Sequence, residues 1–369
     1  MKKIYHLEVN GKTNTGIYVN KIISAVTSIF GASHTIKVFT SEDSFYNSQS
    51  VDPVFKKYGS ISNPIIKLFY YIKGFWGVFN HLNKEQNENT LLHLHWLKFS
   101  LFDLIILTLI RYKTKTKLVF TVHNVLPHEC NFIDKLVYPL IYRRIDVFTF
   151  HSESSYRRLV NELNVDVKKY DIIPHYGNEV GESNEVPKQN SLLFFGSIRD
   201  YKGLDVLIDA CTKISKIKDW TLGIYGKPEM DISDLKMKVK DQGIFEHINW
   251  HTGWIEEDDI DKIFHSHEIV ILPYKHIDNS GLLHLAMSYG KPIIASRLGS
   301  LEDIIEDGKN GILCEPGNPE ELAKKISLLL GDEDLKRKIG DNAAQLMKTK
   351  HSIDRIGQLH CELYKRIEW

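Results

Sequence analysis

Residues 194–210 read FFGSIRDYKGLDVLIDA, and this stretch decides the fold. A short apolar run meets a turn that begins at Gly196 and carries Arg199 and Lys202, and Gly203 then opens an amphipathic segment. This order predicts a buried strand, a glycine turn and a helix N-terminus, which presents backbone N–H groups and the positive end of a helix dipole. With two added cations the turn is suited to a diphosphate. The alternative is a pair of solvated loop side chains.

A second candidate anion site lies in residues 272–296, which read LPYKHIDNSGLLHLAMSYGKPIIAS. We expect a strand that ends at Pro273, then a polar loop, and a helix whose N-cap is Asn279 or Ser280. Backbone N–H groups at such a helix start can hold an anion. The same pattern also occurs as an ordinary strand-to-helix connection.

The rest of the chain alternates short strand-like runs with helical periodicity, which is typical of parallel α/β sheets. The expected strands are 4–9, 36–40, 91–96, 118–122, 147–150, 192–195, 222–225, 269–272, 293–295 and 312–314. The polar stretch 177–190 separates the strand-like runs DIIPH and LLFFG and is the best linker candidate. We therefore expect two α/β domains, 1–180 and 191–350, joined by a linker at 181–190, and an amphipathic C-terminal helix at 351–369.

Two helices of the second half show clear apolar faces. The first face consists of Leu204, Leu207, Ile208 and Cys211, and the second of Leu282, Leu285, Ala286 and Tyr289. Asn318 followed by Pro319 predicts an N-cap with proline at the first helical position.

The charge of the chain is zero overall but is divided unevenly along it. The 369 residues include 47 basic and 47 acidic side chains, of which 22 basic and 15 acidic ones lie in residues 1–180. The N-terminal half is therefore basic and the C-terminal half acidic. A chain with 43% hydrophobic and 25% charged residues is an ordinary globular protein, which excludes disordered and fibrous classes.

Targeting and redox signals indicate a cytosolic protein. The four cysteines are scattered with no C-x-x-C pair, so we expect reduced thiols and no disulfide or zinc framework. We expect no signal peptide, because Glu8 interrupts the N-terminal apolar run. The most apolar window, 99–110, is about twelve residues long and contains Asp103, which is too short and too polar to span a bilayer.

These motifs resemble the GT-B-fold glycosyltransferases, especially the large family 4 of bacterial enzymes that use nucleotide sugars. The resemblance rests on FFGSIRDYKG, on GKPIIA at 290–295, on RLGSLEDIIEDGKNGILCEPGNPEELAKKI at 297–326 and, more weakly, on HLHW at 93–96 and TVHNVLPHE at 121–129. It covers almost all of 192–326. It implies two Rossmann-like parallel-sheet domains that face a cleft, with the C-terminal helix packing back toward the N-terminal domain.

The resemblance also implies roles for individual residues. Lys202, with Arg199 nearby, would contact the donor diphosphate, and the helix start at Ser280, Gly281 and Leu282 would hold its phosphates. His123 would approach the transferred sugar as a catalytic residue. Residues expected at other parts of the site are Gly196, Tyr225 and His284 at the nucleotide and Gly16, His95 and His128 on the acceptor side.

One departure from the family concerns its two glutamates in the pattern E-x7-E. Their places fall on Ile277 and Leu285, which cannot make a carboxylate hydrogen bond. Asp278 is the candidate that replaces the first as a catalytic contact to the sugar, and His284 the candidate next to the second. The donor sugar and the stereochemistry of transfer stay open. Some exopolysaccharide mannosyltransferases with similar HLHW and TVHN motifs invert.

Several other kinds of site are disfavoured. His93 and His95 lie on one strand face and His123 and His128 share a loop, but no carboxylate completes a ligand pattern, so we expect no metal. No G-x-G-x-x-G follows a strand, and there is no G-x-x-x-x-G-K-[ST] loop or G-x-S-x-G elbow. We expect no cofactor apart from the nucleotide diphosphate sugar that serves as donor substrate.

The leading hypothesis is an enzyme that transfers a hexose from GDP-mannose or a UDP-hexose to a lipid-linked saccharide during synthesis of O-antigen, capsule or exopolysaccharide. The alternatives are a nucleotide-sugar 2-epimerase and a non-catalytic binding protein on the same fold. Basic residues at 111–117 near the apolar stretches 67–76 and 99–110 favour peripheral attachment to the anionic inner face of the cytoplasmic membrane. A solvated helix face over buried core helices would explain them equally well. Nucleic acid is not expected as a partner.

Overall fold

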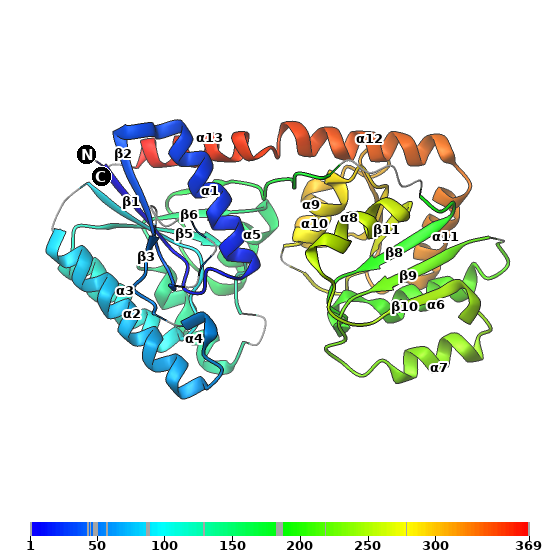
Figure 1. The fold of residues 1–369 in the computed structure, drawn as a ribbon, viewed down its shortest axis with the longest axis horizontal. Coiled ribbons are helices and arrows are strands. Elements are labelled where there is room, and N and C mark those ends of the chain that lie inside the picture. Colours follow the sequence, from blue (N-terminus) through cyan, green and yellow to red (C-terminus); the bar gives the residue numbers. More distant parts are fainter. Residues whose placement is uncertain are drawn as a thin grey trace. The chain divides into compact units, whose positions relative to one another are not determined.

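The computed structural model describes residues 2–42, 44, 46, 51–56, 58–85, 89–127, 130–181, 187–217, 219–277 and 279–367, and of Asn14 only the backbone. Its contacts divide the chain into two compact units. The first unit is Met1–Pro174 together with Ile353–Trp369, and the second is His175–Ser352. Strands and helices alternate in both (Figure 1).

The first unit is built on a parallel sheet of seven strands in the order β3-β2-β1-β4-β5-β6-β7. The strands are β1 (Lys2–Leu7), β2 (His34–Phe39), β3 (Val51–Asp52), β4 (Thr90–Leu94), β5 (Lys117–Val122), β6 (Val147–Phe150) and β7 (Tyr170–Ile172). The helices are α1 (Asn14–Phe30), α2 (Pro64–Glu85), α3 (Ser100–Lys113), α4 (Phe132–Tyr142), α5 (Glu153–Leu163) and α13 (Ile353–Arg366). As expected, the C-terminal helix α13 packs into the first unit, against α1.

The second unit contains a parallel sheet of six strands in the order β10-β9-β8-β11-β12-β13. The strands are β8 (Ser191–Phe195), β9 (Thr221–Tyr225), β10 (Ile248–His251), β11 (Ile269–Leu272), β12 (Ile293–Ser296) and β13 (Ile312–Cys314). The helices are α6 (Leu204–Lys213), α7 (Ser233–Asp241), α8 (Glu257–Ser266), α9 (Gly281–Ser288), α10 (Gly299–Ile304), α11 (Pro319–Leu330) and α12 (Glu333–Thr349).

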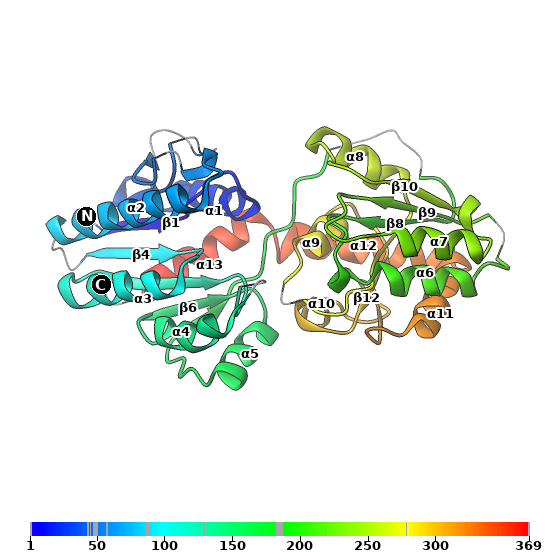
Figure 2. The same cartoon turned by 90° about the horizontal axis from the view of Figure 1, so that it is seen from below.

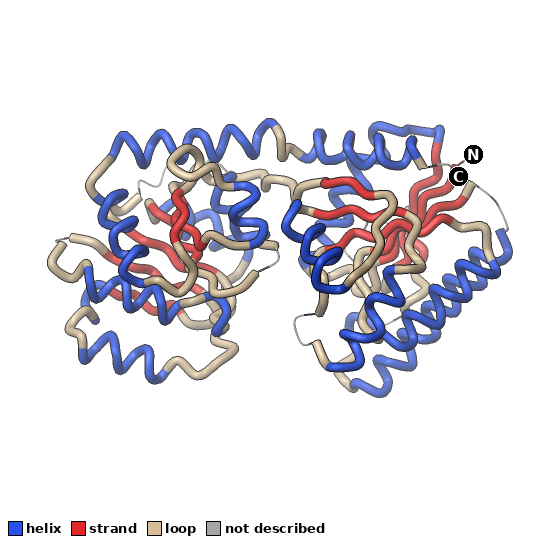
Figure 3. Tube along the Cα trace, turned by 180° about the vertical axis from the view of Figure 1, so that it is seen from behind, coloured by secondary structure: helices blue, strands red, loops and turns tan. Residues whose placement is uncertain are grey.

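Each sheet is enclosed by helices on both faces, as Figure 3 shows with strands in red and helices in blue. In the first unit, α2, α3 and α4 form a layer in which α3 packs between the other two (Figure 2). The central strands of both sheets are buried on both faces, and their Val, Ile, Leu and Phe side chains form the cores. This burial explains why these strands read as continuous apolar runs in the sequence.

Both sheets reverse their strand order in the middle, between β1 and β4 in the first unit and between β8 and β11 in the second. At such a point the connections leave the two neighbouring strands toward opposite sides, which opens a crevice at their carboxyl ends where ligands bind. The turn after β8 and the loop before α9 both start at the reversal of the second sheet. His95 follows β4 directly at the reversal of the first sheet.

The ten expected strands are all present, and the edge strand β7 overlaps the strand-like run DIIPH, but the edge strands β3 and β10 escaped prediction. β3 has only half-buried residues, and β10 alternates buried and exposed ones, so neither forms an apolar run. The predicted face of α6 is buried as expected. The predicted face of α9 is wrong in part, because Leu283, Ala286 and Met287 are its buried apolar residues while Leu282 and Leu285 are half-buried.

Two predicted helix caps are present. Ser280 caps α9 by accepting a hydrogen bond from the Leu283 N–H, and Asn318 caps α11 by accepting one from the Glu321 N–H. None of the helices in the described ranges is long and apolar enough to cross a membrane.

Gly203 fixes the turn between β8 and α6. Its φ is +70°, and a Cβ atom there would lie 1.9 Å from the Pro273 carbonyl oxygen at the end of β11. Gly243 has a similar φ of +67° but has no neighbouring atom within 4 Å of the same position. These two glycines separate the cost of backbone strain from the cost of a backbone clash.

We predict that Gly243→Ala lowers the free energy of unfolding by about 1 kcal/mol, which is the cost of a left-handed backbone alone. Gly203→Ala should lower it by about 3 kcal/mol or more, because the added methyl group also displaces the end of β11. Urea denaturation followed by circular dichroism measures both. Equal losses in the two variants would contradict the packing described for Gly203.

Candidate active site

The turn after β8 holds a lysine against a glycine. Gly196 has a φ of +97°, and a Cβ atom at this position would lie 2.8 Å from the Lys202 Nζ. The same ammonium group lies 5.6 Å from the centre of the Tyr274 ring, beyond the end of β11. Lys202 therefore sits at the carboxyl ends of both strands that flank the sheet reversal. This is the place that the sequence predicted for a diphosphate-binding cation.

The charge of Lys202 is not neutralised by the residues around it. Burial, and secondly the nearby charge of Arg199, lower the pKa of the Lys202 side chain to about 8. No carboxylate of the described residues forms an ion pair with Lys202 or with Arg199. Two adjacent cations without an anion create a positive potential, which a bound anion would relieve.

A second lysine, Lys275, stabilises the same turn in a different way. Its Nζ lies 2.8 Å from Asp200 Oδ1 and 2.9 Å from Asp205 Oδ2, and its backbone N–H donates to the Tyr201 carbonyl at 2.7 Å. These contacts tie the loop after β11 to the turn after β8. Lys275 and Asp200 were not singled out from the sequence. Their pairing depends on the adjacency of β8 and β11, which spacing alone does not reveal.

The start of α9 supplies backbone donors close to this turn. Ser280 is the N-cap, and its hydroxyl satisfies the Leu283 N–H at 3.2 Å. The N–H groups of Gly281 and Leu282 belong to the first turn, where a helix offers them no internal acceptor. Gly281 is exposed and has open space beside its Cα. Ser280 also hydrogen-bonds to Tyr274, whose ring faces Lys202.

The three residues predicted at the nucleotide occupy different surroundings. Gly196 is joined to Tyr225 by a hydrogen bond from its N–H to the Tyr225 carbonyl at 2.9 Å, and the Tyr225 ring stacks on His251 at 4.2 Å. His284 is buried, and burial holds its pKa well below the usual value. Its Nδ1 donates to the Ser280 carbonyl at 3.1 Å, and its ring lies 5.2 Å from that of His175.

The positions of the two family glutamates are apolar here and are used for packing. Ile277 and Leu285 are half-buried against the apolar core that includes Leu283 and Met287. Asp278, predicted to replace the first glutamate, lies outside the described residues, and so does His128 of the first unit.

His123 in the first unit is held by a second histidine. His123 Nδ1 lies 3.0 Å from His151 Nε2, and His151 Nδ1 lies 3.0 Å from the carbonyl oxygen of Ile173. A carbonyl can only accept, so His151 Nδ1 carries a proton, and in neutral His151 the Nε2 atom is the acceptor. His123 Nδ1 must then donate, which leaves Nε2 as the basic nitrogen of His123.

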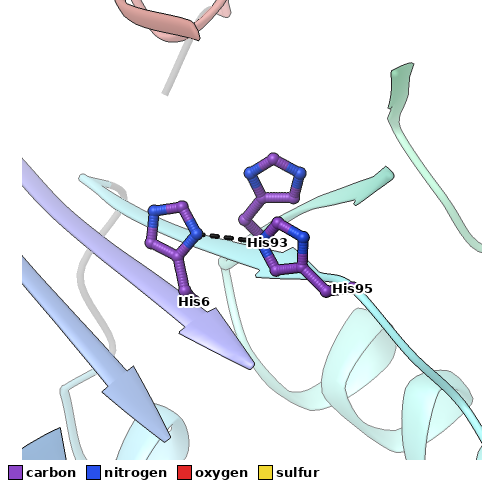
Figure 4. Close-up of side chains that lie close together, drawn as sticks. All are labelled: His6, His93 and His95. Carbon is purple, nitrogen blue, oxygen red and sulfur yellow. Dashed lines mark hydrogen bonds between the residues drawn. The ribbon is translucent and has the colours of Figure 1, made fainter. Parts of the chain in front are cut away.

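His95 belongs to a buried cluster with His6 and His93, shown in Figure 4. His6 and His93 are register partners on β1 and β4, and His6 Nδ1 lies 2.9 Å from His95 Nε2. His93 Nδ1 lies 2.6 Å from the Tyr364 hydroxyl of α13, and His93 Nε2 lies 2.7 Å from Thr121 Oγ1. Burial lowers the pKa of all three rings, so each is neutral near pH 7.

The same three rings could hold a metal ion in principle, because one nitrogen from each lies within 4.8 Å of the others. Both nitrogens of His93 already have hydrogen-bond partners, and His6 and His95 bond to each other. A metal ion with three nitrogen ligands would have to break at least one of these bonds. We interpret the cluster as a neutral hydrogen-bonded network that joins β1, β4 and α13.

Gly16 lies in the first turn of α1 against a tight loop. A Cβ atom at Gly16 would lie 2.8 Å from the Gly11 carbonyl carbon, so helix and loop are in close contact. Buried Glu8 hydrogen-bonds to the Gly11 N–H and to the Thr13 hydroxyl. Burial raises the pKa of the Glu8 carboxyl, although these hydrogen bonds oppose the shift. Glu8 was not predicted as a site residue from the sequence.

A cavity of about 770 Å³ lies at the opposite edge of the first sheet, where β5, β6 and β7 begin. Basic side chains, including Arg143, Lys168 and Lys169, line it. It is remote from His95 and His123, which lie at the carboxyl ends of the strands.

Comparison with known proteins gives similarities in sequence and in fold. Residues 178–346 match the family described as glycosyl transferases group 1. The structure is similar to that of HepE from Anabaena, solved in complex with UDP, with a TM-score of 0.75 and 16% identity over 100% of both chains. That likeness identifies the fold as GT-B.

Two curated relatives illustrate the range of sequence similarity. An uncharacterized glycosyltransferase of Methanocaldococcus jannaschii is 29% identical over 48% of this chain and 45% of its own length. A GDP-mannose:glycolipid 4-beta-D-mannosyltransferase of Xanthomonas campestris is 27% identical over 74% of this chain and 78% of its own. The chain spans about half the length of several curated relatives that it matches. The similarity to the glycosyl transferases group 1 family lies in residues 178–346, all of them in the second unit.

The environment of Lys202 predicts an unusually reactive amine. Modification by an amine reagent requires the neutral form of the amine. Lys202 should therefore reach half of its maximal labelling rate near pH 8. An ordinary lysine does so at about pH 10.4. Peptide mass spectrometry across a pH series measures the rates. Arg199→Gln should move the Lys202 profile upward, since a repelling charge is lost. A wild-type profile like that of an ordinary lysine would contradict the burial of the ammonium group.

Proposed function

We propose that the protein is a glycosyltransferase that moves a hexose from GDP-mannose or a UDP-hexose to a lipid-linked saccharide in surface polysaccharide synthesis. The observation that carries the proposal is the un-neutralised Lys202 ammonium group beside Gly196, at the reversal of the second sheet. A diphosphate is the ligand that supplies the missing negative charge at such a place.

The reaction breaks the bond between the anomeric carbon and the diphosphate oxygen. Negative charge grows on the departing diphosphate, and preorganised donors there lower the barrier. We assign this task to Lys202, Arg199 and the N–H groups of Gly281 and Leu282. These groups supply positive charge without a metal ion, so we propose that transfer needs neither a metal nor another cofactor.

The acceptor hydroxyl forms the new bond to the anomeric carbon and must lose its proton. We assign the proton to His123 Nε2, because the hydrogen bond with His151 keeps the other nitrogen of His123 protonated. His151 is then a positioning residue that fixes the tautomer. The buried network of His6, His93 and His95 supports the strands on this side.

Two relatives support the choice of substrates. HepE was solved with UDP, and the Xanthomonas enzyme is named for GDP-mannose and a glycolipid. A glycolipid acceptor lies in a membrane, which agrees with the basic balance of residues 1–180. We propose that the protein works in the cytoplasm at the anionic inner face of the cytoplasmic membrane.

Transfer from radiolabelled GDP-mannose and UDP-hexoses to a lipid-linked saccharide fraction, with EDTA present, tests the proposal. His123→Ala should lower kcat by about a hundredfold or more, as expected for loss of a general base. Nucleotide affinity should not change, since His123 lies in the first unit. His34→Ala, at the amino end of β2, is the control and should keep full activity.

The proposal would be contradicted if His123→Ala transferred sugar at the wild-type rate. Conversion of the donor sugar to its epimer without any acceptor would indicate the 2-epimerase instead. Saturable donor binding without any turnover would indicate a binding protein.

A further inference from the structure

We infer that the outer face of the α2–α3–α4 layer inserts into the interface of an anionic lipid bilayer. This inference rests on the proposed function, because it names the surface by which the enzyme would reach a lipid-linked acceptor. We call the exposed apolar side chains of these three helices the apolar face.

The helix α2 carries an apolar stripe on its exposed side. Ile65, Phe69, Ile72 and Trp76 are all exposed and lie four, three and four residues apart, so they form one line along the helix. The opposite side of α2, including Phe75, is buried against the sheet. A helix at the surface of a globular protein normally directs polar residues outward, so a second apolar stripe requires an explanation.

The neighbouring helices α3 and α4 continue this surface. Leu101 and Ile105 are exposed on α3, and Phe132, Leu136 and Leu140 are exposed on α4 at the same helical spacing. Exposure across the apolar face runs from 38% to 78% of each side chain, so these residues are not merely the rim of the core. The helix α3 packs against both α2 and α4, and the three helices lie side by side (Figures 1 and 2). We therefore expect their exposed apolar stripes to adjoin one another.

Each acidic side chain of these helices forms an ion pair or a hydrogen bond within the first unit. Within α2, α3 and α4, which the structure describes throughout, the acidic residues are Glu85, Asp103 and Asp134. Glu85 pairs with Lys3 at 2.6 Å, buried Asp103 accepts from the Tyr71 hydroxyl at 2.7 Å, and Asp134 accepts from the Ser100 hydroxyl at 2.6 Å. Glu85 is paired with a cation, whereas Asp103 and Asp134 accept hydrogen bonds from neutral hydroxyl groups, so each of the three carboxyl groups is held by a contact within the unit.

Exposed lysines lie among and beside the apolar residues. Lys73 lies on α2 and Lys135 on α4, and Lys98 precedes α3. Such a mixture of large apolar side chains and cations matches the boundary between lipid acyl chains and anionic headgroups. An interface with a second protein chain would be expected to include acidic or other polar side chains on this surface in addition to the lysines. The charge therefore favours a lipid surface over a second copy of this chain.

The position of the apolar face relates it to the site in the same unit. Helices α3 and α4 begin after the carboxyl ends of β4 and β5, and Leu101, Ile105, Phe132 and Leu136 lie in or near their first turns. His123 directly follows β5, at the same edge of the sheet. A bilayer on the apolar face would present the headgroup end of a lipid-linked acceptor near His123.

Co-sedimentation with vesicles of phosphatidylcholine containing about one quarter phosphatidylglycerol tests the inference. The triple variant Phe69→Ser, Ile105→Ser, Phe132→Ser should lose at least about tenfold in partitioning, because each exposed ring or chain contributes apolar area only when inserted. The control Met237→Ser, Phe245→Ser, Leu328→Ser changes three exposed apolar residues of the second unit and should bind as the wild type does. The variant Lys73→Gln, Lys98→Gln, Lys135→Gln should lose the preference for anionic over neutral vesicles.

The outcomes separate this inference from the proposed function. Vesicle binding that the apolar variant retains would overturn the inference, even if sugar transfer to the glycolipid were found. Binding that the variant abolishes would support it, even if no transfer were found with any donor. A wild-type dimer that the apolar variant converts to a monomer, without vesicle binding by either, would identify the apolar face as an interface between copies and overturn the inference.

Discussion

An uncompensated positive charge at the carboxyl end of β8 is the constraint on which the second unit depends. Lys275 is neutralised by Asp200 in the same turn and by Asp205 at the start of α6, whereas Lys202 and Arg199 have no such pairing with any described residue. A half-buried, partly desolvated cation without a counterion costs stability, which is consistent with the lowered pKa of Lys202. We propose that the turn keeps this cost because a bound anionic ligand supplies the missing charge.

The geometry of the turn is set by backbone packing rather than by the charged groups themselves. Gly196 leaves room for the Lys202 ammonium group, and Gly203 lets the start of α6 approach the end of β11. The reversal of strand order opens the crevice above both. The sheet of the first unit has the same reversal of strand order, but the side chains near it are neutral histidines, His93 and His95, instead of cations.

Much of this arrangement can be predicted from the sequence. The features that cannot be predicted are those that depend on which strands lie next to each other in the sheet. Buried central strands such as β8 and β11 are clear from their apolar runs, and Lys202 and Ser280 follow from turn and cap chemistry. The edge strands β3 and β10 lack that pattern because one or both of their faces meet water. The histidine cluster requires the register between β1 and β4, which places His6 beside His93, and no local pattern reports a register. The bond between His123 and His151 likewise depends on the pairing of β5 with β6.

The central claim is that Lys202 recognises the diphosphate of a nucleotide. Calorimetric titration of the full chain with UDP and UMP, and in parallel with GDP and GMP, tests it without any acceptor or turnover. The account concerns whichever of UDP and GDP binds more tightly. It predicts that this diphosphate binds at least about tenfold more tightly than the corresponding monophosphate, as expected for one added charge-assisted contact. In Lys202→Ala the ratio of the monophosphate Kd to the diphosphate Kd should fall close to one. An unchanged preference in the variant, in a protein that remains folded, would contradict the account.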